Sequence, residues 1–174
     1  MYHRRSIRWQ DYDYTGNGAY FITICTHAKN YLFGDITDGV MRLNEWGQIA
    51  KDCWTAIPEH FPTTSLDAFV VMPNHVHGII IINTDADQAA KPGPSSQPRQ
   101  FAKPIPQSLS TIIGAFKSAA TKRINLLGEN TLSPIWQRNY HEHVIRDHER
   151  YEFIRAYIDT NPQRWAEDSL YTKL

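Results

Sequence analysis

Two short apolar segments separated by only two residues constrain the fold of this chain most strongly. Residues 66–72 and 75–82 are rich in Val, Ile and Phe, and Pro73 and Asn74 lie between them. Residues of these types favour strands, and a Pro-Asn pair favours a tight turn. A two-residue connection can join neighbouring strands only in an antiparallel arrangement. The sequence therefore predicts a β-hairpin over residues 66–82.

Helices and strands alternate on either side of this hairpin. Residues 19–26 are rich in β-branched and aromatic residues and are predicted to form a strand. Apolar residues recur at helical spacing over residues 44–60, which predicts a helix with Asn44 as its N-cap. Beyond the hairpin, Ser108 or Ser110 caps a second helix.

The C-terminal part adds one more strand and one more helix. Residues 135–145 are predicted to form the fourth strand, and Asp147 caps the last helix. Pro162 should end that helix at about Asn161, because the residue before a proline disfavours the helical conformation. The order is β-α-β-β-α-β followed by a helix. This order predicts an α+β, ferredoxin-like (RRM-like) fold with one antiparallel sheet and helices packed on one face.

Length and composition fit one globular domain. The chain has 174 residues, of which 41% are apolar and 21% are charged, ordinary values for a protein with a hydrophobic core. We expect a single domain over residues 1–174. Residues 83–107 contain five of the ten prolines, with Gly, Ser and Gln between them, and this composition predicts a flexible insertion.

The sequence has no feature of a membrane or secreted protein. The longest aliphatic run, residues 79–82, is far too short to span a bilayer. No apolar segment of the kind found in secretion signals follows the basic N-terminus. Cys25 and Cys53 have neither metal-like nor redox-like spacing. A reduced, cytoplasmic protein without a membrane partner is expected.

Two histidines at alternate positions, His75 and His77, carry the strongest chemical signal. Side chains alternate along a strand, so both project from one face and Val76 projects from the other. Two imidazoles placed in this way can bind one divalent metal ion near the end of the hairpin. The alternative is structural hydrogen bonding or packing, since two ligands do not complete a metal site. His141 and His143 form a second alternating pair, which either lines the same cleft or lies at the surface.

Of the nine tyrosines, Tyr157 stands in the most informative context. Asn161 follows four residues later, so both side chains lie on nearly the same face of the last helix. The amide oxygen of Asn161 can then bind a metal ion while Tyr157, as a nucleophile, directs its hydroxyl to the same place. The alternative is an amphipathic helix in which Tyr157 packs on the sheet and Asn161 caps the C-terminus.

These motifs, in this order, resemble the HUH single-tyrosine transposases and, among them, the REP-associated tyrosine transposases. The histidine pair stands in the motif MPNHVHG, and the tyrosine stands in YIDTNPQRW. Several separated motifs in one order are far more specific than any single motif. The resemblance covers most of the chain, at residues 4–8, 18–25, 32–34, 71–78, 116–117, 136–140, 143–146 and 157–165.

The resemblance implies a metal-dependent endonuclease and strand transferase that acts on single-stranded DNA folded into short hairpins. In that family the two histidines bind Mg²⁺ or Mn²⁺, which assigns His75 and His77, and the position of Asn161 supplies a third ligand. Tyr157 would attack a phosphodiester and keep the 5′ phosphate. The chain departs from the pattern in two places. Asn161 stands where insertion-sequence relatives have glutamine, and residues 83–107 are longer than this connection should be.

The distribution of basic residues bears on DNA binding. The formal net charge is zero, whereas domains that bind nucleic acid are usually basic. Local basic patches nevertheless hold phosphates without a global positive charge. We expect DNA contacts from six cations: Arg4, Arg5, Arg8, Lys117, Arg138 and Arg146.

Two other functions share parts of this pattern. A non-catalytic ferredoxin-like module that binds nucleic-acid hairpins as a regulator would stack bases on the aromatic residues of its sheet. A replication initiator or relaxase of the broader HUH group would share the histidines and the tyrosine, but the small size of the chain argues against it. A metal-dependent covalent adduct with DNA distinguishes a transposase from the hairpin-binding regulator. Whether the protein is a monomer or a homodimer stays open.

Overall fold

A four-stranded antiparallel sheet forms the centre of the computed structural model, which describes residues 17–83, 106–128 and 134–171. Strand β1 (Gly18–Cys25) pairs with β5 (His75–Ile82) on one side and with β6 (His141–Ile145) on the other. Strand β4 (Thr64–Met72) pairs with β5 at the edge, which gives the order β4-β5-β1-β6. In chain order these are the second, third, first and fourth sheet strands. The predicted ferredoxin-like fold is therefore confirmed.

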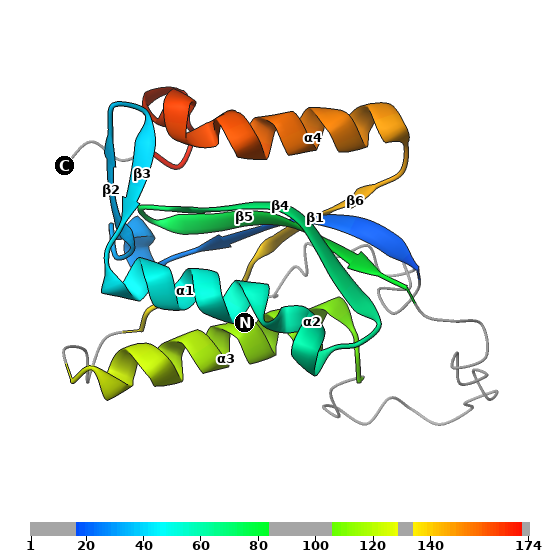
Figure 1. The fold of residues 1–174 in the computed structure, drawn as a ribbon, viewed down its shortest axis with the longest axis horizontal. Helices are drawn as coiled ribbons and strands as arrows, with labels where there is room; N and C mark the ends of the chain where they lie inside the picture. The colour runs from blue at the N-terminus through cyan, green and yellow to red at the C-terminus, as the bar shows by residue number, and fades with distance from the viewer. Residues whose placement is uncertain (1–16, 84–105, 129–133, 172–174) are drawn as a thin grey trace, which may run out of the picture.

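Helices cover both faces of this sheet. Helices α1 (Glu45–Thr55) and α3 (Leu109–Leu126) lie together on one face, and α4 (His148–Thr160) lies on the other (Figure 1). The expectation of helices on one face alone holds for α1 and α3 and is wrong for α4. An amphipathic pattern shows that a helix has a buried side, but it does not show which face of the sheet that side meets.

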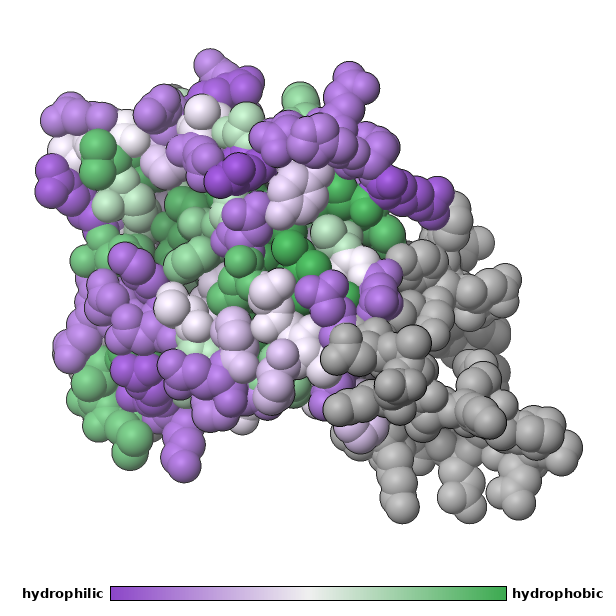
Figure 2. Space-filling view, turned by 45° about the vertical axis from the view of Figure 1, so that its right-hand side comes forward, coloured by the Kyte–Doolittle hydropathy of each residue, from purple (hydrophilic) through white to green (hydrophobic). Residues whose placement is uncertain are grey.

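Two hydrophobic layers follow from this arrangement. The larger layer lies under α1 and α3, where Trp54 is fully buried against Phe69 and Phe116. The smaller layer lies under α4 and includes Ile79 and Ile154. Hydrophilic side chains cover the outer surface of the helical layers, and hydrophobic ones gather in the band between them (Figure 2).

A glycine in β5 brings the strand close to the larger layer. A Cβ atom at Gly78 would lie 2.4 Å from Cζ2 of the Trp54 indole, so no side chain fits at this position. Gly78 directly follows His77 in the strand. The packing of Trp54 against Gly78 therefore helps to fix the part of β5 that carries the histidine pair.

The predicted N-caps are present at three helices. The Asn44 side chain accepts a hydrogen bond from the Gly47 amide, and Ser108, rather than Ser110, caps α3 through the Thr111 amide. The carboxylate of Asp147 accepts from the Arg150 amide at the start of α4. These side chains satisfy amide groups that have no partner within the helix.

The predicted helix over residues 44–60 is two helices, α1 and the short α2 (Ile57–His60). Pro58 lies in the first turn of α2. Proline lacks the amide hydrogen that would continue α1 and clashes with the carbonyl of the preceding turn, so the break occurs here.

The predicted fourth strand is shorter than expected, since β6 begins at His141 and not at residue 135. Before it, Trp136 forms only an isolated bridge with Thr26. The ammonium of Lys117 donates to the carbonyls of Gln137, Arg138 and Asn139, which therefore do not join a strand ladder.

A second, two-stranded sheet was not predicted. Strands β2 (Gly34–Thr37) and β3 (Val40–Leu43) form a hairpin whose turn has positive φ angles at Asp38 and Gly39. An Asp-Gly pair is a strong hairpin signal. Two short 3-10 helices complete the described elements, η1 (His27–Lys29) and η2 (Asn161–Glu167).

Several predicted features lie outside the described residues. These are Arg4, Arg5, Arg8 and most of the proline-rich segment, residues 84–105. Among the residues that are described, no helix combines the length and the apolar character needed to cross a membrane.

Candidate metal and tyrosine site

The two histidines of β5 lie on the face of the sheet that α4 covers. Val76 belongs to the larger layer on the opposite face, and Ile79 packs under α4, so strand alternation places His75 and His77 with Ile79. His75 is fully buried, His77 is 3% exposed, and their ring centroids are 4.3 Å apart. The structure thus brings the predicted pair together beside the β4–β5 turn.

Neighbouring side chains fix the orientation of both imidazole rings. Nδ1 of His75 lies 2.8 Å from the amide oxygen of Asn74, which can only accept a hydrogen bond. Nδ1 of His75 therefore carries the proton, and its Nε2 keeps a free lone pair. Nδ1 of His77 lies 2.8 Å from the Thr23 hydroxyl, so its Nε2 also faces the site. A histidine oriented through its second nitrogen is the usual arrangement for a metal ligand.

Burial also keeps both rings neutral. Burial lowers the pKa of His77 to about 4, although the nearby Asp168 carboxylate acts in the opposite direction. Burial, the neighbouring His77 and Lys29 hold the pKa of His75 well below 6.5. Neutral imidazole is the form that binds metal ions, so both side chains are ready to bind one at neutral pH.

Tyr157 reaches this pair from α4. It follows Ile154 by three residues and precedes Ile158, and both isoleucines are buried against the sheet. The Tyr157 hydroxyl lies 3.3 Å from Nε2 of His77 and donates to Oδ2 of Asp168 at 3.1 Å. Burial and the Asp168 carboxylate raise the pKa of Tyr157 to about 12.

Asn161 lies at the point where α4 ends and η2 begins. It is the C-cap of α4, as the structural alternative expected, and its side chain also turns into the site and is only 2% exposed. Nδ2 of Asn161 donates to Oδ2 of Asp168 at 2.8 Å. Asn161 and Tyr157 thus both donate to the Asp168 carboxylate, which lies beside the histidine pair.

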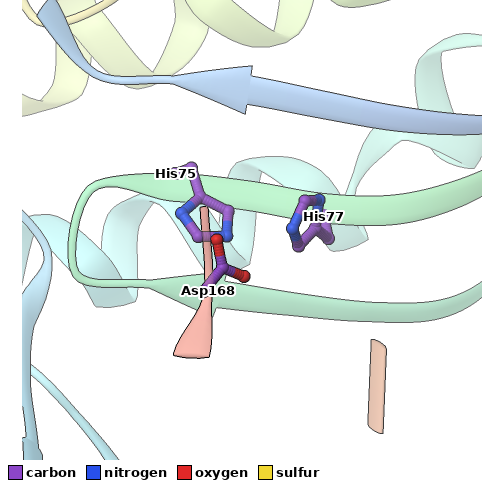
Figure 3. Close-up of side chains that lie close together, drawn as sticks. All are labelled: His75, His77 and Asp168. Atoms are coloured by element: carbon purple, nitrogen blue, oxygen red, sulfur yellow. The ribbon is translucent and has the colours of Figure 1, made fainter. Parts of the chain in front are cut away.

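Asp168 is a member of this site that the sequence analysis missed. One ring nitrogen from each of His75 and His77 and one carboxylate oxygen of Asp168 all lie within 4.8 Å of one another. Figure 3 shows the Asp168 carboxylate facing the two rings, which project from the same strand. Asp168 follows η2, and helical periodicity does not extend to a residue beyond the end of a helix. In the sequence it stands beside Glu167 as one more acidic residue.

Two buried polar atoms at the site fit a metal ion. Nε2 of His75 and Oδ1 of Asn161 are buried and have no hydrogen-bond partner among the described residues. Buried polar atoms without a partner are uncommon, because each costs free energy. Both atoms are ligands that divalent metals accept. Two imidazole nitrogens, an amide oxygen and a carboxylate therefore form a donor set that fits a divalent ion.

The other predicted residues lie farther from Tyr157. Lys117 is on α3, across the sheet from α4, where it lines a groove together with the exposed Arg138. Arg146 follows β6 and is exposed. Directly paired residues share a face of the sheet. Thr23 pairs with His77 on one side and with His141 on the other, so His141, and with it His143, lies on the same face as His77. Both of these histidines are exposed on the edge strand.

Comparison with known proteins identifies a relative in sequence and similar folds among solved structures. No model of a known protein family matches the chain. An uncharacterised protein of Haemophilus influenzae is 42% identical over 172 residues, which cover 98% of this chain and 94% of the relative. The solved structure of a REP-associated tyrosine transposase bound to a REP hairpin has a TM-score of 0.58 at 20% identity, over 95% of this chain and 73% of that one. A candidate transposase from Deinococcus radiodurans has a TM-score of 0.49 at 17% identity, over 88% and 96% of the two chains. The likeness to the REP-associated tyrosine transposase shows that the two chains share a fold.

Proposed function

We propose that this chain, which belongs to the same family as the Haemophilus influenzae protein, is a metal-dependent DNA endonuclease and strand transferase. Its substrate would be single-stranded DNA that folds into short hairpins. One observation carries this proposal. The Tyr157 hydroxyl lies 3.3 Å from Nε2 of His77, beside the cluster of His75, His77 and Asp168, whose side chains are of the types that bind divalent metals.

The proposed cofactor is Mg²⁺ or Mn²⁺, held by His75, His77 and Asn161. The unpartnered Nε2 of His75 and Oδ1 of Asn161 support this assignment. When bound, the ion would polarise a non-bridging phosphate oxygen and favour the phenolate form of the tyrosine. Thr23 and Asn74 would keep the two imidazoles in the orientation that presents Nε2.

Tyr157 acts as the nucleophile in this proposal. Its oxygen bonds to phosphorus, the bond from phosphorus to the 3′ oxygen breaks, and the 5′ phosphate stays on the tyrosine. The departing 3′ oxygen ends as a hydroxyl. One phosphodiester replaces another, so a second 3′ hydroxyl can reverse the step and join two strands. The packing of α4 on the sheet through Ile154 and Ile158 holds the nucleophile at the required place.

The proposed partner is a DNA hairpin made of short palindromic repeats. The REP-associated transposase of the same fold is bound to a REP hairpin. Exposed Arg138 and Arg146 would contact the DNA backbone, and Arg4, Arg5 and Arg8 would add contacts from the N-terminal segment. Lys117 would act in part by holding the backbone that carries Arg138, since its ammonium donates to three carbonyls there.

A covalent-adduct assay with two matched variants tests this function. Tyr157→Phe removes the hydroxyl that donates to Asp168 in the site. Tyr151→Phe removes a hydroxyl from the same helix, but this hydroxyl donates to Asp67 and lies outside the site. With Mn²⁺ and a single-stranded hairpin oligonucleotide, the parent and Tyr151→Phe should form an adduct that survives denaturant. Tyr157→Phe should bind the hairpin and form no adduct.

The chemical form of the adduct decides between the candidate functions. The adduct should carry the 5′ phosphate on a peptide containing Tyr157 and should disappear in excess chelator. An adduct on another tyrosine, or one that persists in Tyr157→Phe, would refute the assignment. Hairpin binding by the parent without any adduct would favour the non-catalytic regulator.

A further inference from the structure

We infer that Asp168 is a direct ligand of the divalent metal and supplies the negative charge of the site. This inference rests on the proposed metal site at His75 and His77. It extends that site by a residue that lies beyond α4 and η2, seven positions after Asn161.

The first argument is distance. A carboxylate oxygen of Asp168 and one nitrogen from each of His75 and His77 lie within 4.8 Å of one another. Ligands of one divalent ion lie about 2.0–2.2 Å from it, so donor atoms this close together need little movement to share an ion. The carboxylate faces both rings (Figure 3).

The second argument is the network that holds Asp168 in place. Oδ1 of Asp168 accepts from the Leu170 amide at 2.7 Å, and Oδ2 accepts from Nδ2 of Asn161 at 2.8 Å. The Leu170 carbonyl in turn accepts from Nδ2 of Asn74 at 2.9 Å, and the Oδ1 of Asn74 orients His75. Asn74 is fully buried. One buried amide therefore positions both a histidine of β5 and the segment that carries the carboxylate.

The third argument is charge. His75 and His77 are neutral ligands, and Asn161 is neutral as well. Bringing a doubly charged ion into a site with only neutral ligands is unfavourable, because the ion loses its hydration without gaining a counter-charge. Asp168 is the acidic member of the cluster in the described part of the chain. A carboxylate can accept up to four contacts, so it can bind an ion while it keeps its bonds to Asn161 and Leu170.

Direct measurement of metal binding tests this inference independently of DNA cleavage. Asp168→Asn keeps the size of the side chain and removes its charge. Glu167→Gln is the matched control, because Glu167 is the exposed neighbour and its carboxylate accepts from Arg164 on the surface, away from the histidine pair. Mn²⁺ affinity is measured by electron paramagnetic resonance of the free ion, and the Co²⁺ absorption spectrum of each protein reports its ligand set.

Asp168→Asn should weaken Mn²⁺ binding by at least about tenfold and change the Co²⁺ spectrum, whereas Glu167→Gln should leave both unchanged. Unchanged Mn²⁺ affinity in Asp168→Asn would overturn the inference. Weaker binding with an unchanged Co²⁺ spectrum would also overturn it, since Asp168 would then act through its charge alone. If Asp168→Asn does not fold in chelator, Asp168→Ser takes its place with the same expected results.

The same proteins separate this inference from the proposed function. If the parent binds Mn²⁺ through Asp168 but forms no adduct with hairpin DNA, the metal site stands and the nuclease proposal fails. If the adduct forms and Asp168→Asn binds Mn²⁺ like the parent, the nuclease proposal stands and the role of Asp168 fails.

Discussion

The buried histidine pair should make the free energy of unfolding depend on pH below neutrality. Burial lowers the pKa of His77 from its usual 6.5 to about 4, and the pKa of His75 is lowered as well. The unfolded chain exposes both rings, so it takes up protons at a pH at which the folded chain does not. The contribution of the neutral histidines to the free energy of unfolding is therefore fully present above pH 6.5 and is lost as the pH falls toward 4.

The magnitude for His77 follows from these two values. One pKa unit corresponds to about 1.4 kcal/mol, so the full effect of His77 is about 3 kcal/mol. About 2 kcal/mol of this should be lost between pH 7.5 and pH 5. His75 contributes in the same direction. A loss of this size is a large fraction of the 5–15 kcal/mol that is typical of a whole domain.

Urea unfolding at pH 7.5 and pH 5, with a chelator present, measures this loss. His77→Gln should be less stable at pH 7.5 and should lose about 2 kcal/mol less than the parent between the two pH values. His60→Gln, which removes an exposed histidine from α2, should lose as much as the parent. Equal losses in the parent and in His77→Gln would refute the reasoning, because His77 would then not be the group that takes up the proton.

Two further predictions concern the scaffold. Gly78→Ala should destabilise the protein by about 1–3 kcal/mol in urea unfolding, because its Cβ would lie 2.4 Å from the buried Trp54 ring. Gly114 in α3 is the control, because a Cβ there meets no other part of the protein within 4 Å. Gly114→Ala should be neutral or stabilising by up to about 1 kcal/mol. If Gly114→Ala destabilised the protein more than Gly78→Ala, the packing argument would be contradicted. Removing about ten residues from within 83–107 should change the unfolding free energy by less than about 1 kcal/mol, since the entropy of loop closure depends only weakly on loop length. A large loss of stability on this deletion would show that the segment packs against the domain.

The strand that carries the histidines could be predicted from the sequence because its pattern is local. The two apolar segments and the Pro-Asn turn fixed the hairpin, and alternation along β5 placed His75 and His77 on one face. The same reasoning, applied to helical spacing, placed Tyr157 and Asn161 on nearly one side of α4. In both cases a single element carries the two residues, so no knowledge of the tertiary structure was needed.

The position of Asp168 could not be predicted, because it depends on contacts between distant parts of the chain. Its segment is held by Asn74, 96 residues before Leu170. The face of the sheet that α4 covers is also set by tertiary packing, and without it the sequence could not show that Tyr157 meets His77. The boundary of β6 was missed for the same reason, since Lys117 of α3 binds the carbonyls just before the strand.

The electrostatics of the site explain why the proposed chemistry should depend on metal. With its pKa raised to about 12, the Tyr157 phenol is ionised in only about one molecule in 10⁵ at pH 7. Burial and the Asp168 carboxylate cause this shift, so without metal the proposed nucleophile would be weaker than a free tyrosine. The neutral histidines add no positive charge to offset it. A divalent cation beside Asp168 would neutralise the carboxylate and favour the phenolate, reversing the effect of Asp168 on Tyr157. Asp168, which together with burial disfavours the phenolate without metal, would thus also attract the metal, so metal binding and the activation of Tyr157 would be coupled.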